Sequence, residues 1–287
     1  MRIAITGVTG RVGRALADHL GVLHEVIELS RREWSLTDPR LSHRLADLDF
    51  DALLHPASMT SLDECERVPA LAEAVNVDGT RRLLEGCEGR PMLYFSTDYV
   101  LDGREPGWKG EDAPIRPVSV YGATKAAAEA LVGAEGAAVL RVSWVFGPEM
   151  PAFPDQILRR ALAGEHLAAV DDKFSMPCHT RDLASGVAAW IEAGCPGGVF
   201  QACQSGEATS WHGMAELVSE FIFQSGLRPE RPRVERLKLS EMKSFIAERP
   251  RFTAMSTARL EALTGWKPRP WREAMWEYLE ESQGVCR

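Results

Sequence analysis

The chain has 287 residues, of which 45% are hydrophobic and 26% charged, and its formal net charge at pH 7 is −8. This length and composition suffice to bury one large or two unequal cores without metal or disulfides. The negative charge argues against a nucleic-acid partner, which would require clustered Lys and Arg. No apolar run reaches the ~18 to 20 residues of a membrane span, so no membrane association is predicted.

The strand pattern begins at once with Arg2, and the cysteines are scattered without a CxxC pair. We therefore expect a cytoplasmic protein whose thiols are reduced. The cysteines concerned are Cys65, Cys87, Cys178, Cys195, Cys203 and Cys286.

The first half of the chain alternates short apolar runs with amphipathic stretches, which is typical of βα units in a doubly wound parallel sheet. The predicted strands are Ile3–Thr6, Val26–Leu29, Ala52–Leu54, Met92–Ser96 and Ala138–Val142. The predicted helices are Val12–Leu20, Pro69–Gly86 and Val120–Val132. We expect an α/β fold with the first domain at residues 1–148.

After Pro148 the pattern loosens, which predicts a smaller, mainly substrate-binding α/β domain over residues 149–287. Short strands are predicted at Leu167–Val170 and Gly198–Gln201, and parts of 166–202 are expected to return to the first sheet. The predicted helices are Asp155–Ala163, Asp182–Glu192, Trp211–Ser225 and Trp271–Glu280. Trp266, Trp271 and Trp276 are expected to pack the small domain.

A glycine-rich segment, Thr6-Gly7-Val8-Thr9-Gly10-Arg11-Val12-Gly13, follows the first strand and opens the first helix. Its G-x-x-G-x-x-G spacing allows a tight turn, close approach to a pyrophosphate and close packing of the helix on the strand. The helix N-terminus would offer free N–H groups to the phosphates. A glycine turn without a ligand is the alternative, but the strand before and the helix after favour a dinucleotide.

The second strand ends in Leu29-Ser30-Arg31-Arg32, where the two guanidinium groups suit a 2′-phosphate. This favours NADP(H) over NAD(H). Glu28 keeps NAD(H) open, because an acidic side chain there could bind the ribose 2′-hydroxyl.

Tyr121 and Lys125 are four residues apart in a helical pattern and therefore share a face. A ketone reductase needs such a pair: the ammonium of Lys125 would lower the pKa of Tyr121 and bind the nicotinamide ribose, and the phenol would donate a proton. Thr97 lies at a strand end, where parallel sheets bind ligands, and its hydroxyl could hold the carbonyl oxygen. An exposed helical pair is the alternative, which the glycine loop and Thr97 together disfavour.

The chain resembles the extended short-chain dehydrogenases, and most closely the dTDP-4-dehydrorhamnose reductase group. The matching segments are Tyr94-Phe95-Ser96-Thr97-Asp98-Tyr99-Val100-Leu101-Asp102-Gly103, Tyr121-Gly122-Ala123-Thr124-Lys125 and Arg141-Val142-Ser143-Trp144-Val145-Phe146-Gly147. Further matches are Ala57-Ser58-Met59-Thr60-Ser61-Leu62-Asp63, Asn76-Val77-Asp78-Gly79-Thr80, Asp182-Leu183-Ala184, Arg249-Pro250, Gly265-Trp266 and Pro270-Trp271.

The resemblance implies a Rossmann-type domain with a small C-terminal domain, a nucleotide-sugar substrate and a catalytic triad of Thr97, Tyr121 and Lys125. It implies reduction of a 4-keto deoxysugar nucleotide, as in dTDP-rhamnose biosynthesis. Together with the residue chemistry, the resemblance implies that the cofactor contacts Gly7, Gly10, Arg11, Val12, Gly13, Ser30, Arg31, Arg32, Ser35, Leu36, Ala57, Ser58, Met59 and Lys125. It implies that the sugar nucleotide contacts Thr60, Leu62, Thr97, Asp98, Tyr99, Tyr121 and Trp144.

Three departures from the family pattern limit the transfer of substrate identity. They are Ser58-Met59, Pro177-Cys178-His179, and Arg11 in place of a common glutamine, which would add charge beside the cofactor phosphates. Cys178 and His179 lack metal-ligand spacing, so no metal is predicted.

Three other functions stay open. A sugar-nucleotide dehydratase is disfavoured because Tyr99 is a poor base at neutral pH. A 4-epimerase would have to retain NAD⁺, against which Arg31 and Arg32 speak. A non-catalytic NADP-binding regulator, like the methionine adenosyltransferase regulatory subunit, could keep much of the triad. The sequence also leaves a homodimer open.

Overall fold

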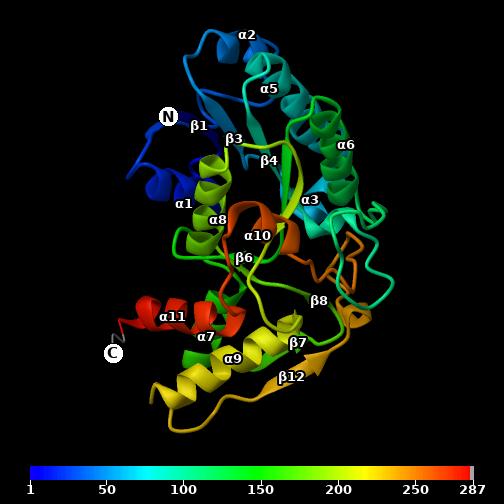
Figure 1. Cartoon of the computed structure of the whole chain (residues 1–287). Helices are drawn as coiled ribbons and strands as arrows, with labels where there is room; N and C mark the ends of the chain where they lie inside the picture. The colour runs from blue at the N-terminus through cyan, green and yellow to red at the C-terminus, as the bar shows by residue number, and fades with distance from the viewer. Residues whose placement is uncertain (285–287) are drawn as a thin grey trace.

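The computed structural model describes residues 1–284 and is built around a six-stranded parallel sheet (Figure 1). In sheet order its strands are β10 (Gly198–Ala202), β5 (Ala138–Val142), β4 (Met92–Thr97), β3 (Ala52–His55), β1 (Arg2–Thr6) and β2 (Glu25–Leu29). The chain runs outward from β1 to β2 and then returns to β3 on the other side of β1. Ligands bind at such a switch point, beyond the carboxyl ends of the strands. The predicted doubly wound parallel sheet is confirmed.

Side chains alternate between the two faces of the sheet, and each face has its own core. On one face lie α2 (Leu41–Ala46), α5 (Gly79–Cys87) and α6 (Val120–Ala134), and on the other lie α1 (Arg11–Leu20) and α8 (Thr180–Glu192) (Figure 1). Both faces being covered explains why the strands read as continuous apolar runs.

The smaller part of the molecule lies below the sheet in Figure 1. Its helices are α7 (Phe153–Leu162), α9 (Trp211–Gln224) and α11 (Trp271–Gln283), while α10 (Ala258–Thr264) contacts α8 and β10. Its short strands pair two by two: β6 (Val145–Phe146) with β9 (Cys178–His179), β7 (Leu167–Val170) with β12 (Val234–Leu237), and β8 (Phe174–Ser175) with β11 (Thr209–Ser210). A 3-10 turn, η3, covers Leu239–Glu241. Of the two short strands predicted in 166–202, β10 joins the main sheet and β7 does not.

The segment predicted as one helix over Pro69–Gly86 is divided. Its parts are α4 (Pro69–Glu73), the π-helical turn η1 (Ala74–Asp78) and α5, and a further short helix, α3 (Leu62–Arg67), precedes it. A pattern of 3.6 residues per turn, read over a whole segment, does not identify a single π-turn within it.

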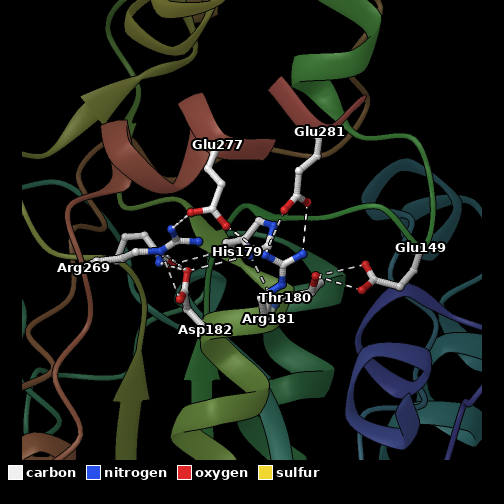
Figure 2. Close-up of polar contacts among 9 residues, drawn as sticks. Glu149, His179, Thr180, Arg181, Asp182, Arg269, Glu277 and Glu281 are labelled. Atoms are coloured by element: carbon white, nitrogen blue, oxygen red, sulfur yellow. Dashed lines mark hydrogen bonds and ion pairs between the residues drawn. The ribbon is translucent and has the colours of Figure 1, made fainter. Parts of the chain in front are cut away.

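An ion-pair network fastens α11 to the start of α8 (Figure 2). Arg181 donates to Glu277 at 2.8 Å and to Glu281 at 3.0 Å. Arg269 donates to Asp182 at 3.0 Å and also pairs with Glu277. Because α8 packs on α1 and shares a core with strands of the main sheet, this network joins the C-terminal helix to the larger part of the molecule.

Two of the predicted tryptophans pack the small domain, and the third does not. Trp271 is buried, and the Trp276 ring lies 5.2 Å from that of Phe221 in α9. Trp266 instead lies against Gly186 of α8.

The five cysteines within the described residues are free thiols, and Cys286 lies outside the described residues. Among residues 1–284 no helix combines the length and the apolar character needed to cross a bilayer.

Candidate active site

The glycine loop between β1 and α1 lies against the segment that follows β3. Gly7 has a φ of +62°, and a Cβ there would stand 3.0 Å from Ala57. A Cβ at Gly13 would stand 2.2 Å from the Gly7 carbonyl oxygen, so α1 can begin this close to the loop only with glycine at 13. These close contacts bring the loop to the N-terminus of a ten-residue helix, which is the arrangement that binds a pyrophosphate.

The guanidinium of Arg11, which is expected to add charge beside the cofactor phosphates, binds backbone carbonyl groups in this structure. Its guanidinium donates to the carbonyl oxygens of Val145 at 3.1 Å and Pro151 at 2.8 Å. Glu149, in the same loop, accepts a hydrogen bond from Thr180 at 3.0 Å (Figure 2). Arg11 thus anchors the β6–α7 loop beside the glycine loop.

The end of β2 presents the residues predicted to select the cofactor. Arg31 and Arg32 are exposed, and neither side chain forms an ion pair or a hydrogen bond within residues 1–284. Glu28, by contrast, accepts from Arg14 at 3.1 Å. This pairing reduces the charge that Glu28 could offer to a ribose hydroxyl, because the carboxylate already has a guanidinium partner.

Two more cofactor-side residues lie near the start of α5. A Cβ at Gly79 would stand 2.7 Å from the Leu36 side chain, so Leu36 and α5 are in close contact. Ser35 shares a hydrogen bond with Thr37 at 2.9 Å.

The predicted catalytic residues converge at the carboxyl end of β4. Thr97 is the last residue of β4 and caps the 3-10 turn η2 (Asp98–Val100). Helix α6 starts at the Ser119 cap, whose hydroxyl accepts from the Gly122 N–H at 3.2 Å. A Cβ at Gly122 would stand only 2.3 Å from the Tyr99 carbonyl oxygen, so glycine lets α6 approach η2. This approach brings Tyr121 close to Thr97.

Burial sets the protonation chemistry of Tyr121 and Lys125. It raises the pKa of Tyr121 well above its usual range, while the hydroxyl of Thr97 lowers it in part. It lowers the pKa of Lys125 to about 7, with Glu129 acting in the opposite direction. Lys125 donates to the Phe95 carbonyl oxygen at 2.6 Å. The expected lowering of the Tyr121 pKa by Lys125 is therefore wrong here, because desolvation dominates.

Asn76 and His55 support this site, although no role is predicted for either of them from the sequence. Asn76, in η1, accepts from the Met59 N–H at 2.7 Å and donates to Thr124 of α6 at 3.0 Å. His55 hydrogen bonds to Thr6 at 2.8 Å, and burial lowers its pKa to about 3, so it is neutral. A single sequence carries no signal for these contacts, since the partners are 17 to 49 residues away.

Some of the residues predicted to face the sugar nucleotide pack around Tyr121. Leu62 packs with Tyr99 and Tyr121, whose ring centroids are 6.0 Å apart, and Met59, predicted to contact the cofactor, joins the same cluster. Asp98 is buried and accepts hydrogen bonds from Ser175 at 3.0 Å and from Thr253. Thr60, which follows Met59 in the sequence, is exposed.

Trp144 adopts a strained backbone. Its φ of 42° lies in the left-handed region, which a bulky side chain seldom adopts and which costs roughly 1–3 kcal/mol. Its indole N–H is buried and has no acceptor within residues 1–284. A strained residue with an unused donor is typical of a ligand-binding position.

The family model described as RmlD substrate binding domain matches residues 1–283. The chain belongs to this family. It is 30% identical to the spore coat polysaccharide biosynthesis protein SpsK of Bacillus subtilis (strain 168), over 99% of each chain. It is 32% identical to a dTDP-4-dehydrorhamnose reductase of Streptomyces griseus, over 96% of this chain and 92% of that one. A solved dTDP-4-dehydrorhamnose reductase from Clostridium acetobutylicum superposes with a TM-score of 0.91 at 27% identity, covering 99% and 100% of the two chains.

The predicted resemblance to the extended short-chain dehydrogenases, and the Rossmann-type fold, are thereby confirmed. As a member of the RmlD family the chain is a short-chain oxidoreductase. The roles of its individual site residues remain predictions.

Proposed function

We propose that this protein reduces the ketone of a 4-keto-6-deoxy sugar nucleotide, with NADPH as the reductant. The observation that carries the proposal is the convergence of Thr97 and Tyr121 at the carboxyl end of β4, on the sheet edge that also bears the glycine loop. The RmlD relatives named as dTDP-4-dehydrorhamnose reductases support the same substrate class.

The residues present fit such a cofactor. The glycine loop has no side chains at positions 7, 10 and 13 that would block a pyrophosphate. Ser30, Arg31 and Arg32 would hold the 2′-phosphate of the adenosine ribose. Lys125, on α6, would hold the nicotinamide ribose after its buried ammonium releases the Phe95 carbonyl oxygen. When bound, NADPH supplies the hydride to the carbonyl carbon.

Tyr121 then donates its phenolic proton to the carbonyl oxygen, and Thr97 holds that oxygen by a hydrogen bond. The high pKa of Tyr121 suits a donor, because the phenol stays protonated at neutral pH until the oxygen gains electron density. In this structure the Thr97 hydroxyl donates to one oxygen of Asp98 at 3.3 Å, while Ser175 and Thr253 donate to the other. Thr97 would therefore exchange Asp98 for the carbonyl oxygen when the substrate binds.

One hollow beside the Asp102–Gly103 turn offers arginines to the nucleotide part of the substrate. It is lined by Arg104, Arg249 and Arg251 and also by Asp102, Asp172 and Glu248. Arg249 pairs with Asp63 and Arg251 with Asp172, so a diphosphate would compete with these carboxylates. Guanidinium groups bind diphosphates by charge-assisted and often bidentate hydrogen bonds. We infer that the diphosphate lies toward this hollow and the sugar toward Tyr121.

The test measures oxidation of NADPH and NADH with dTDP- and UDP-linked 4-keto-6-deoxy sugars. We expect turnover with NADPH. The double substitution Arg31→Ala with Arg32→Ala should raise the KM for NADPH by about 10-fold or more and leave that for NADH unchanged. Arg40→Ala, which removes an exposed arginine of the same segment, is the matched control. Equal KM values for the two cofactors in the wild type would contradict the preference for NADPH.

A further inference from the structure

A second buried lysine, Lys173, lies next to the site and takes no part in the chemistry described above. It follows β7, and its side chain is fully buried, with 0% of the residue exposed. Its ammonium donates to the Pro250 carbonyl oxygen at 2.7 Å. Burying a cation costs free energy. A fully buried ammonium is therefore expected to have a structural or functional role.

Two aromatic rings lie beside the ammonium of Lys173. The ammonium lies 4.8 Å from the ring centroid of Tyr99 and 5.5 Å from that of Trp144. Both distances are within the range of a cation–π interaction. Burial lowers the pKa of Lys173 to about 8, Asp98 opposes this change, and Arg249 adds to it.

These contacts join parts of the molecule that are distant in sequence. Tyr99 comes from η2, Trp144 follows β5, and Pro250 belongs to the Arg249–Arg251 segment that lines the hollow beside the Asp102–Gly103 turn. Lys173 therefore touches both aromatic residues predicted to face the sugar and the backbone beside the hollow. Since it has no exposed surface, it acts on a substrate only through these neighbours.

We propose that Lys173 is a positioning residue of the substrate site, whose ammonium fixes the rings of Tyr99 and Trp144 relative to Thr97 and Tyr121. The interaction would also hold Trp144 in its strained backbone conformation, with the indole N–H available to a substrate oxygen. The inference deepens the proposed function and rests on it for the identity of the substrate.

The kinetic test compares the wild type with Lys173→Met, Lys173→Gln and the control Lys238→Met. Lys238 is an exposed lysine of the same domain, paired with Asp171. We expect Lys173→Met to raise the KM for the sugar nucleotide by about 10-fold or more, with the Kd for NADPH within about twofold of the wild type. Lys238→Met should change neither. An unchanged substrate KM in a folded Lys173→Met protein would overturn the proposal.

Lys173→Gln separates the charge from the hydrogen bond, since the amide keeps a donor for the Pro250 carbonyl and lacks the cation. We expect its substrate KM to lie between those of the wild type and Lys173→Met. A wild-type KM in this variant would assign the effect to the hydrogen bond and overturn the role of the cation.

A readout without turnover separates this proposal from the proposed function. Urea midpoints of Lys173→Met, Tyr99→Leu and the double variant form a double-mutant cycle. We expect non-additive effects, because each single substitution already breaks the same contact. If the wild type turns over no sugar nucleotide, the proposed function fails while the cycle still decides whether Lys173 holds Tyr99. Strict additivity would refute that contact.

Discussion

Replacing Lys125 by methionine should make the cofactor-free protein more stable near neutral pH while removing its activity. Burial lowers the pKa of Lys125 from 10.5 to about 7. At about 1.4 kcal/mol per pKa unit, keeping this group buried costs about 4 kcal/mol near pH 7. The substitution also leaves the Phe95 carbonyl oxygen without its donor, which costs about 1–3 kcal/mol. The net gain at pH 7 is therefore about 1–3 kcal/mol.

The pH dependence has a definite sign. Between pH 7 and 10.5 the unfolded chain holds a proton on Lys125 that the folded chain lacks, so the stability of the wild type rises with pH. The wild type should recover about 2 kcal/mol between pH 7 and pH 9, and the advantage of Lys125→Met should shrink by the same amount.

Urea unfolding of both proteins at pH 7, 8 and 9 measures this difference, and other titrating groups cancel between them. Lys238→Met, which removes an exposed lysine, should show no pH-dependent difference from the wild type. A constant difference between Lys125→Met and the wild type across this range would refute the argument that Lys125 is buried at a lowered pKa.

Two further predictions concern helix α6. Glu129→Gln should lower the free energy of unfolding by about 3–5 kcal/mol in urea titrations, because it leaves the buried guanidinium of Arg141 without its carboxylate partner at 2.8 Å; a loss below about 1 kcal/mol would contradict this. Gly122→Ala should lower kcat/KM by about 100-fold, because a Cβ there meets the Tyr99 carbonyl oxygen at 2.3 Å and displaces Tyr121. Gly133→Ala, on the same helix with open space around it, should leave kcat/KM unchanged, and equal effects of the two would contradict the close-approach argument.

The parallel sheet could be predicted from the sequence because its determinants are local. Buried strands read as apolar runs, and the glycine spacing 7, 10 and 13 reports a tight turn between a strand and a helix. The carboxyl-end rule then placed Thr97 and the Tyr121–Lys125 pair at the same edge of the sheet. These features can be predicted without knowledge of any contact between residues that are distant in the sequence.

Other features depend on partners that are far away in the chain. The guanidinium of Arg11 binds carbonyl groups 134 and 140 residues away. The sequence does not reveal these partners, so the residue type alone suggested a contact with phosphate. Lys173 reads as a surface lysine in an Asp-Asp-Lys run, yet its acceptor is 77 residues away at Pro250. The pKa of Tyr121 was misjudged for the same reason, because the degree of burial is a property of the whole fold.

The most direct test of the account compares NADPH oxidation by the wild type and by Tyr121→Phe, with a dTDP-linked 4-keto-6-deoxy sugar as substrate. The predicted result is turnover by the wild type and a kcat lower by about 100- to 10,000-fold in the variant, with the Kd for NADPH unchanged. Wild-type kcat in Tyr121→Phe would contradict the assignment of Tyr121 as proton donor. A wild type that binds NADPH and oxidises none with any sugar ketone would contradict the reductase itself.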